Sequence, residues 1–224
     1  MKNRTLLTSI AAALASVGAF TSAHAATVTF QEGVGGYTGT VDTWIDANQP
    51  TFEYSTDVEL EIANNGTNIR ETLIRFENIF GNGAGQIALG STITSATLTF
   101  SERSGGGTTS LHRMLTSWNA TDTYGDIGPL ASGTDYLATA DDTESLAPTF
   151  SLTVTNTVQA WSDGTSNFGW TLLKGGNTGR VHSSEATTLG LRPELSITVV
   201  PEPSSYAAVF GALVLTLVVV RRRR

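Results

Sequence analysis

The sequence predicts an all-β protein built as an antiparallel β-sandwich, with a jelly roll as the more specific form. Apolar and polar side chains alternate in most of the apolar runs between residues 26 and 200, and this period of two is typical of half-buried strands. Segments rich in Gly and Asn, such as 64–68 and 174–179, separate these runs and indicate turns. No segment of this region keeps a helical period for ten residues. About eight to ten short strands are therefore expected.

The expected strands can be justified in chain order. The first carries Val28 and Phe30 on one face. In residues 57–65 the apolar side chains at 58, 60 and 62 should face the core, and the two glutamates between them should face water. Residues 71–80 are apolar on both faces, which is typical of a central strand. Four later strands show the same alternation: Ala96, Leu98 and Phe100; Phe150, Leu152 and Val154; Phe168, Trp170 and Leu172; and Leu195, Ile197 and Val199.

Two segments of this region do not show a strand pattern. Residues 155–164 predict a short helix of one or two turns that ends at Gly164. Residues 121–149 are polar, rich in Asp and irregular. We expect them to form a long surface loop, and such loops often carry function.

The N-terminal residues 1–25 have the pattern of a secretory signal peptide. Lys2 and Arg4 precede a run without charge that extends to Phe20, and Ala23-His24-Ala25 forms a small-residue cleavage site. We therefore expect export, with cleavage by signal peptidase after Ala25.

The C-terminal residues 201–224 combine three features. Pro201-Glu202-Pro203 is followed by an apolar run over residues 206–220 and then by four arginines at 221–224. A helix over the apolar run would span roughly 22 Å, which is short of the ~30 Å hydrocarbon core of a bilayer. The arginines would hold its end in the cytoplasm. The segment is either a plain anchor in the inner membrane or a processing signal whose tail is later removed.

These three features in this order resemble the PEP-CTERM sorting signal of exported proteins from Gram-negative bacteria that make exopolysaccharide. The resemblance implies processing by exosortase, a membrane protease that acts in the region of Pro201, Glu202 and Pro203. It further implies only transient anchoring in the inner membrane, and a final location at the cell surface or in the extracellular matrix.

The region between the two ends is long enough for one domain of about 175 residues. Six of the 13 basic residues and one of the 20 acidic residues lie in the ends, which leaves a net charge near −12 for residues 26–200. Such a surface excludes nucleic acid as a partner. It tolerates neutral glycans, but an anionic glycan would need a local basic patch or a bridging metal ion. The absence of cysteine excludes thiol nucleophiles and Cys-based zinc sites.

Residues 26–200 also resemble the DNRLRE-type domain, which is related to a carbohydrate-binding module family of secreted bacterial proteins. The resemblance rests on short motifs in order, at residues 39–50, 70–76, 93–100, 110–125, 158–173 and 182–199. It implies a β-sandwich that binds polysaccharide.

Glycan binding requires flat aromatic faces, and three side chains are the candidates. If Val41 and Ile45 face the core, Trp44 faces outward between Asp42 and Asp46. Trp118 and Tyr124 flank a polar loop that could present them to solvent, although packing at the edge of the sandwich is the alternative. Trp161 and Trp170 are expected in the core.

Metal binding and catalysis have weaker support. The hard oxygens of Asp122 and Asp126, or of Asp141, Asp142 and Glu144, could bind calcium, but no EF-hand spacing is present and a solvated acidic loop is the favoured explanation. Ser183 and His182 lie outside any G-x-S-x-G motif. Arg75 is expected to pair with Glu71 or Glu77 as a structural ion pair. No enzyme activity and no resident cofactor are therefore expected.

Three functions remain open from the sequence. The first is an exported protein of the surface or matrix that binds extracellular polysaccharide. The second is a structural matrix protein whose partner is another protein, and the third is a small polysaccharide lyase or hydrolase.

Overall fold

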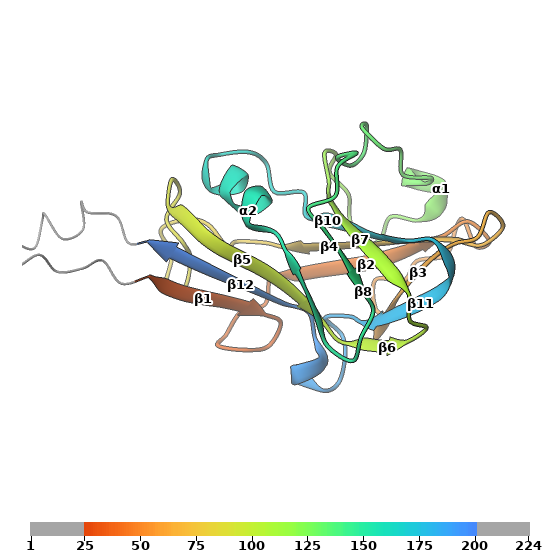
Figure 1. The fold of residues 1–224 in the computed structure, drawn as a ribbon, viewed down its shortest axis with the longest axis horizontal. Coiled ribbons are helices and arrows are strands. Elements are labelled where there is room, and N and C mark those ends of the chain that lie inside the picture. The colour runs from red at the N-terminus through yellow and green to blue at the C-terminus, as the bar shows by residue number, and fades with distance from the viewer. Residues whose placement is uncertain (1–24, 201–224) are drawn as a thin grey trace, which may run out of the picture.

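The computed structural model describes residues 25–200, in two antiparallel sheets (Figure 1). The predicted signal peptide up to His24 and the predicted sorting signal at 201–224 lie outside the described residues. The smaller sheet has the strand order β1–β12–β5–β9. Its strands are β1 (Ala26–Gln31), β12 (Glu194–Val200), β5 (Thr92–Phe100) and β9 (Phe150–Thr153).

The larger sheet has eight strands in the order β6–β11–β3–β4–β10–β7–β8, with β2 also paired to β4. All named strand pairs are antiparallel. Its strands are β2 (Thr40–Asp46), β3 (Glu59–Asn64), β4 (Ile69–Phe76), β6 (Glu102–Ser104), β7 (Thr108–Arg113), β8 (Asp142–Ser145), β10 (Trp170–Lys174) and β11 (Gly176–His182).

The main hydrophobic core lies between the two sheets. The smaller sheet contributes side chains such as Leu98 and Leu195, and the larger sheet contributes Ile74 and Trp170, all of them fully buried. Helix α2 (Thr155–Ser162) packs against β5 and adds Trp161, whose ring centroid lies 4.5 Å from that of Trp170. The predicted all-β sandwich, the short helix and the core positions of both tryptophans are confirmed. The jelly-roll form stays a prediction.

A second, smaller cluster covers the opposite face of the larger sheet. Ile45 and Leu73 of the sheet pack there against Met114, Trp118 and Leu130 from the segment after β7. Strand β4 is therefore buried on both of its faces, as the apolar pattern of residues 71–80 predicted.

Several expectations for individual segments were wrong. Residues 121–149 are not one irregular loop, because they contain helix α1 (Tyr124–Ile127) and strand β8. The turn expected at 174–179 is partly strand, since β11 begins at Gly176 and its register shifts before Gly179. Val58 is 44% exposed, so the inward face of that run begins at Leu60.

Two minor features complete the description. A short 3-10 helix, η1 (Leu189–Leu191), precedes β12. Among residues 25–200, no helix has the length and apolar character needed to cross a membrane.

Candidate functional site

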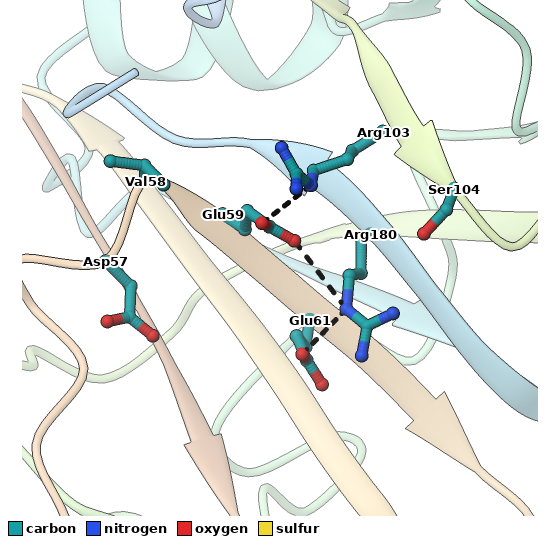
Figure 2. A pocket seen from close by; sticks show the side chains of 7 residues that line it. All are labelled: Asp57, Val58, Glu59, Glu61, Arg103, Ser104 and Arg180. Atoms are coloured by element: carbon teal, nitrogen blue, oxygen red, sulfur yellow. Dashed lines mark hydrogen bonds and ion pairs between the residues drawn. The ribbon is translucent and has the colours of Figure 1, made fainter. Parts of the chain in front are cut away.

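Strands β3, β6 and β11 form a groove of about 740 Å³, shown in Figure 2. Leu60 and Ile62 of β3 point into the core. Glu59 and Glu61 alternate with them along the strand and therefore point to the other face. The antiparallel register sets Arg180 of β11 directly opposite Glu61. We call this site the arginine groove, and its lining residues are Asp57, Val58, Glu59, Glu61, Arg103, Ser104 and Arg180.

Charges of opposite sign alternate along the floor of the arginine groove. Glu59 Oε1 lies 2.6 Å from Arg103 Nε, and its Oε2 lies 3.6 Å from Arg180 Nε. Glu61 Oε1 accepts a hydrogen bond from Arg180 Nε at 2.8 Å, while its other oxygen pairs with Arg70. Arg70 Nε in turn lies 3.3 Å from Asp46 Oδ2. These contacts link five strands, β2, β3, β4, β6 and β11, and fix the positions of both groove arginines.

Both groove arginines keep donors that point to solvent. In the described part of the chain, each makes its ion pairs through Nε (Figure 2), which leaves the outer Nη nitrogens free to donate. The side chains of Arg103 and Arg180 are 52% and 38% exposed. Hydrogen bonding to Glu61 raises the pKa of Arg180, so this guanidinium remains charged. The groove therefore offers fixed cationic donors on a protein that is acidic overall.

His182 lies beside the groove, opposite Glu59 in the ladder between β11 and β3. Partial burial lowers the pKa of His182, the charge of Arg103 lowers it further, and Glu59 opposes both effects. At neutral pH this imidazole is therefore uncharged, and the cationic character of the groove comes from the arginines.

The expectation that Trp44 faces water was wrong. Trp44 is only 6% exposed, because the segment between β2 and β3 folds over it. The ring of Tyr54 stacks on the ring of Trp44, with 3.7 Å between the ring centroids. Trp44 Nε1 donates to Asp57 Oδ2 at 3.2 Å, and the Arg70 guanidinium lies 5.5 Å from the ring centroid. Trp44 is therefore hydrogen-bonded to Asp57, one of the residues that line the arginine groove.

Trp118 and Tyr124 lie together in the second cluster. Trp118 is 3% exposed and donates from Nε1 to the carbonyl of Phe168 at 2.7 Å. Arg75 lies 4.8 Å above its ring and pairs with Glu77, one of the two expected partners. Tyr124 is half-buried against the same cluster. Carbohydrate binding by Trp44, Trp118 or Tyr124 stays a prediction, since the two tryptophans are buried and Tyr124 is only partly exposed.

Sequence reasoning missed the aromatic side chain that is exposed. Phe52 has 53% of its surface exposed, the largest fraction of any aromatic residue within 25–200. Its ring centroid lies 4.7 Å from that of Tyr54, and the ring of Tyr54 in turn stacks on Trp44. The only available signal was its polar, turn-rich surroundings in residues 47–57, which indicate a surface segment.

A second groove, of about 400 Å³, lies between the larger sheet and residues 129–136. Its lining includes Glu71, Leu130 and Tyr136. Glu71 Oε2 accepts a hydrogen bond from the backbone N–H of Leu130 at 3.1 Å. Burial raises the pKa of Glu71 to about 7, the Leu130 N–H opposes this shift, and the charge of Asp135 adds to it.

The proposed calcium ligands are each engaged within the protein. Asp122 accepts a hydrogen bond from the backbone N–H of Asn119 at 2.7 Å. Asp126 accepts one from the backbone N–H of Thr123, the residue that caps the start of α1. Asp141 accepts a hydrogen bond from Trp170 Nε1 at 2.8 Å, and Asp142 accepts one from the backbone N–H of Thr153 at 2.7 Å. Across residues 25–200, no group of three or more His, Cys, Asp or Glu side chains is arranged to hold a metal ion. Calcium at these four aspartates stays a prediction.

The antiparallel sandwich and its polar grooves define a β-sandwich binding domain. Residues 36–199 match the model of carbohydrate-binding module family 96, and the chain belongs to that family. This finding supports the expected carbohydrate-binding domain and suggests a non-catalytic role. It is compatible with an extracellular location. A search of curated proteins finds no match.

Proposed function

We propose that this protein binds extracellular polysaccharide through the arginine groove. The observation that carries the proposal is the match of residues 36–199 to a carbohydrate-binding module family. The groove adds the chemistry, because the Nη donors of Arg103 and Arg180 stand beside the carboxylate acceptors of Asp57, Glu59 and Glu61. Sugar hydroxyl groups both donate and accept, so such a mixed lining suits them.

A polysaccharide with carboxylate groups is the ligand that this groove fits best. Guanidinium groups bind carboxylates through two parallel hydrogen bonds, which are stronger than bonds between neutral groups. Three of the seven basic residues in 26–200 lie in the ion-pair network that links β2, β3, β4, β6 and β11: Arg70, Arg103 and Arg180. Asp46, Glu59 and Glu61 pair with them there, so the free Nη donors of Arg103 and Arg180, rather than a net positive charge, would bind the carboxylates of the glycan.

Phe52 is the candidate platform for the apolar face of a sugar ring. Its own ring is held by Tyr54, which lies on Trp44. Trp44 donates a hydrogen bond to Asp57 of the arginine groove. A platform that is already ordered loses little conformational entropy on binding.

The test is titration of the purified full-length protein with soluble uronic-acid and neutral polysaccharides, followed by calorimetry. Because Arg103 is half-exposed, Arg103→Gln should leave the fold intact and weaken binding of the uronic polymer about tenfold, which corresponds to one charge-assisted hydrogen bond. Arg103→Lys is the matched control, since it keeps the charge but loses the planar fork. Unchanged affinity in Arg103→Gln and in Arg180→Gln would rule out this groove.

The wider function we propose is that of an exported protein of the cell surface or matrix. The sequence pattern of residues 1–25 supports export, and the pattern of 201–224 supports exosortase processing near Pro201-Glu202-Pro203 after transient anchoring through 206–220. The mass of the C-terminal peptide of the mature protein tests this. A peptide that still ends in Arg221–Arg224 would contradict processing.

A further inference from the structure

The carboxyl groups of Asp42, which is buried, and Glu185, which is partly buried, face each other where β2 meets the segment after β11. Asp42, in the middle of β2, is 3% exposed, and its Oδ2 accepts a hydrogen bond from the backbone N–H of Ser184 at 2.8 Å. Glu185 Oε1 accepts from the hydroxyl of Ser184 at 2.8 Å. We call Asp42 and Glu185 the carboxyl pair.

The remaining oxygen of each carboxyl group lacks a partner. Asp42 Oδ1 and Glu185 Oε2 are both buried, and neither accepts a hydrogen bond from an N–H or hydroxyl group of another residue in the described structure. Within residues 25–200, no Lys, Arg or His side chain forms an ion pair with either group. Burial raises the pKa of Asp42 well above its ordinary range, the charge of Glu185 and a hydrogen bond between the two carboxyl groups raise it further, and hydrogen bonds from Ser184 oppose these effects. The site therefore lacks positive charge.

A third oxygen lies on the same side of the strand. Thr40 precedes Asp42 by two positions, so both side chains point to one face of β2. Thr40 Oγ1 is also buried without a partner. Two carboxylates and a hydroxyl are hard oxygen ligands, which suit Ca²⁺, whereas the site offers no thiolate or imidazole for zinc.

We propose that the carboxyl pair binds a divalent cation of the hard class, with Ca²⁺ as the best fit and Thr40 Oγ1 as a further ligand. This site is separate from the aspartates of residues 121–149. The ion would join the middle of β2 to the segment 183–186.

The segment joined in this way also supports the arginine groove. Ser183 Oγ donates to the carbonyl of Asp57 at 2.6 Å, and the Ser183 N–H donates to the carbonyl of Val58 at 3.2 Å. Asp57 and Val58 both line the groove. A cation at the carboxyl pair would therefore stabilise this wall.

The test is thermal melting of the full-length protein at pH 7.5, in EGTA and in about 1 mM CaCl₂, a concentration suited to extracellular calcium sites. We expect Ca²⁺ to raise the melting temperature by about 3–5 °C and Mg²⁺ to raise it less. Calorimetry should show one site. This readout does not involve a glycan, so its failure would leave the proposed carbohydrate binding untouched.

Glu185→Gln is the informative variant. Its amide can donate to Asp42 Oδ1, so the protein should fold, melt higher than the wild type in EGTA, and lose the response to Ca²⁺. Glu53→Gln removes one exposed carboxylate from the segment between β2 and β3 and is the matched control, which should respond like the wild type. A Ca²⁺ response that persists in Glu185→Gln would place the ion elsewhere. No response in the wild type, with melting that rises as the pH falls from 7.5 to 5.5, would show a shared proton instead.

Discussion

Glu71 illustrates how the surroundings of one side chain create a dependence on pH. Glu71 is 7% exposed, and its carboxyl group has one hydrogen bond from Leu130 and no cationic partner among the described ion pairs. Its pKa of about 7 in the folded state exceeds its ordinary value of 4.5. The folded state therefore binds more protons than the unfolded state between these two values. Its stabilising contribution is complete below pH 4.5 and is lost as the pH rises through 7.

Replacing Glu71 with Gln should remove this dependence, because the amide mimics the protonated acid and can still accept from Leu130. At pH 8 we expect Glu71→Gln to be more stable than the wild type by about 3 kcal/mol at most, and at pH 4.5 to be nearly equal to it. Urea denaturation at both pH values measures the difference. Parallel curves for the two proteins across this range would contradict the assignment.

The aromatic residues show where sequence reasoning about the candidate site succeeds and where it fails. Trp161 and Trp170 were expected in the core and are buried there. Trp44 was expected outside because alternation distinguishes the two faces of a strand. Alternation contains no information about what covers a face, and here residues 47–57 place Tyr54 over Trp44. The arginine groove was missed for another reason: Arg103 and Arg180 are far apart in sequence and come together only because β6 pairs with β11.

At the level of elements, strands with strict alternation could be predicted and strands with irregular register could not. In β5, Ala96, Leu98 and Phe100 are buried as expected. Strand β11 was missed in part because Gly and Asn dominate its start, and its ladder with β3 shifts register between Gly176 and Gly179. Long-range pairing there overrides the local preference of these residues for turns.

Gly169 determines how β10 approaches β4. Its φ of +74° is unfavourable for other residues, and an added Cβ would meet the carbonyl oxygen of Ile74. We expect Gly169→Ala to lower the free energy of unfolding by more than about 2 kcal/mol.

Gly175, at the other end of the same strand, is the matched control for this prediction. It has no atom within 4 Å of an added Cβ and no positive φ. Gly175→Ala should change stability by less than about 1 kcal/mol. Denaturant titration of both variants compares the two sites, and equal effects would show that contact with β4 is not the cause.

At the level of the whole molecule, β1 closes the smaller sheet although it precedes the family match, which begins at residue 36. All six residues of β1 oppose residues of β12, and Phe30 reaches the main core with 3% exposure. Without β1, strand β12 would present an unpaired edge, and such edges associate with other chains.

Deletion of residues 1–35 should therefore lower the melting temperature by about 10 °C or more and promote self-association. Deletion of residues 1–24 is the control, since it leaves β1 complete. Size-exclusion chromatography and thermal melting measure both effects. A deletion of 1–35 that remains monomeric and melts like the control would show that β1 is dispensable.

The pairing of Ala26 with Val199 brings both ends of the described chain to one pole of the sandwich, and β6 and β11 lie toward the other pole (Figure 1). A tether at either terminus would consequently orient the domain in the same way. In both cases the arginines would be directed away from the point of attachment and toward any polymer in the surrounding medium.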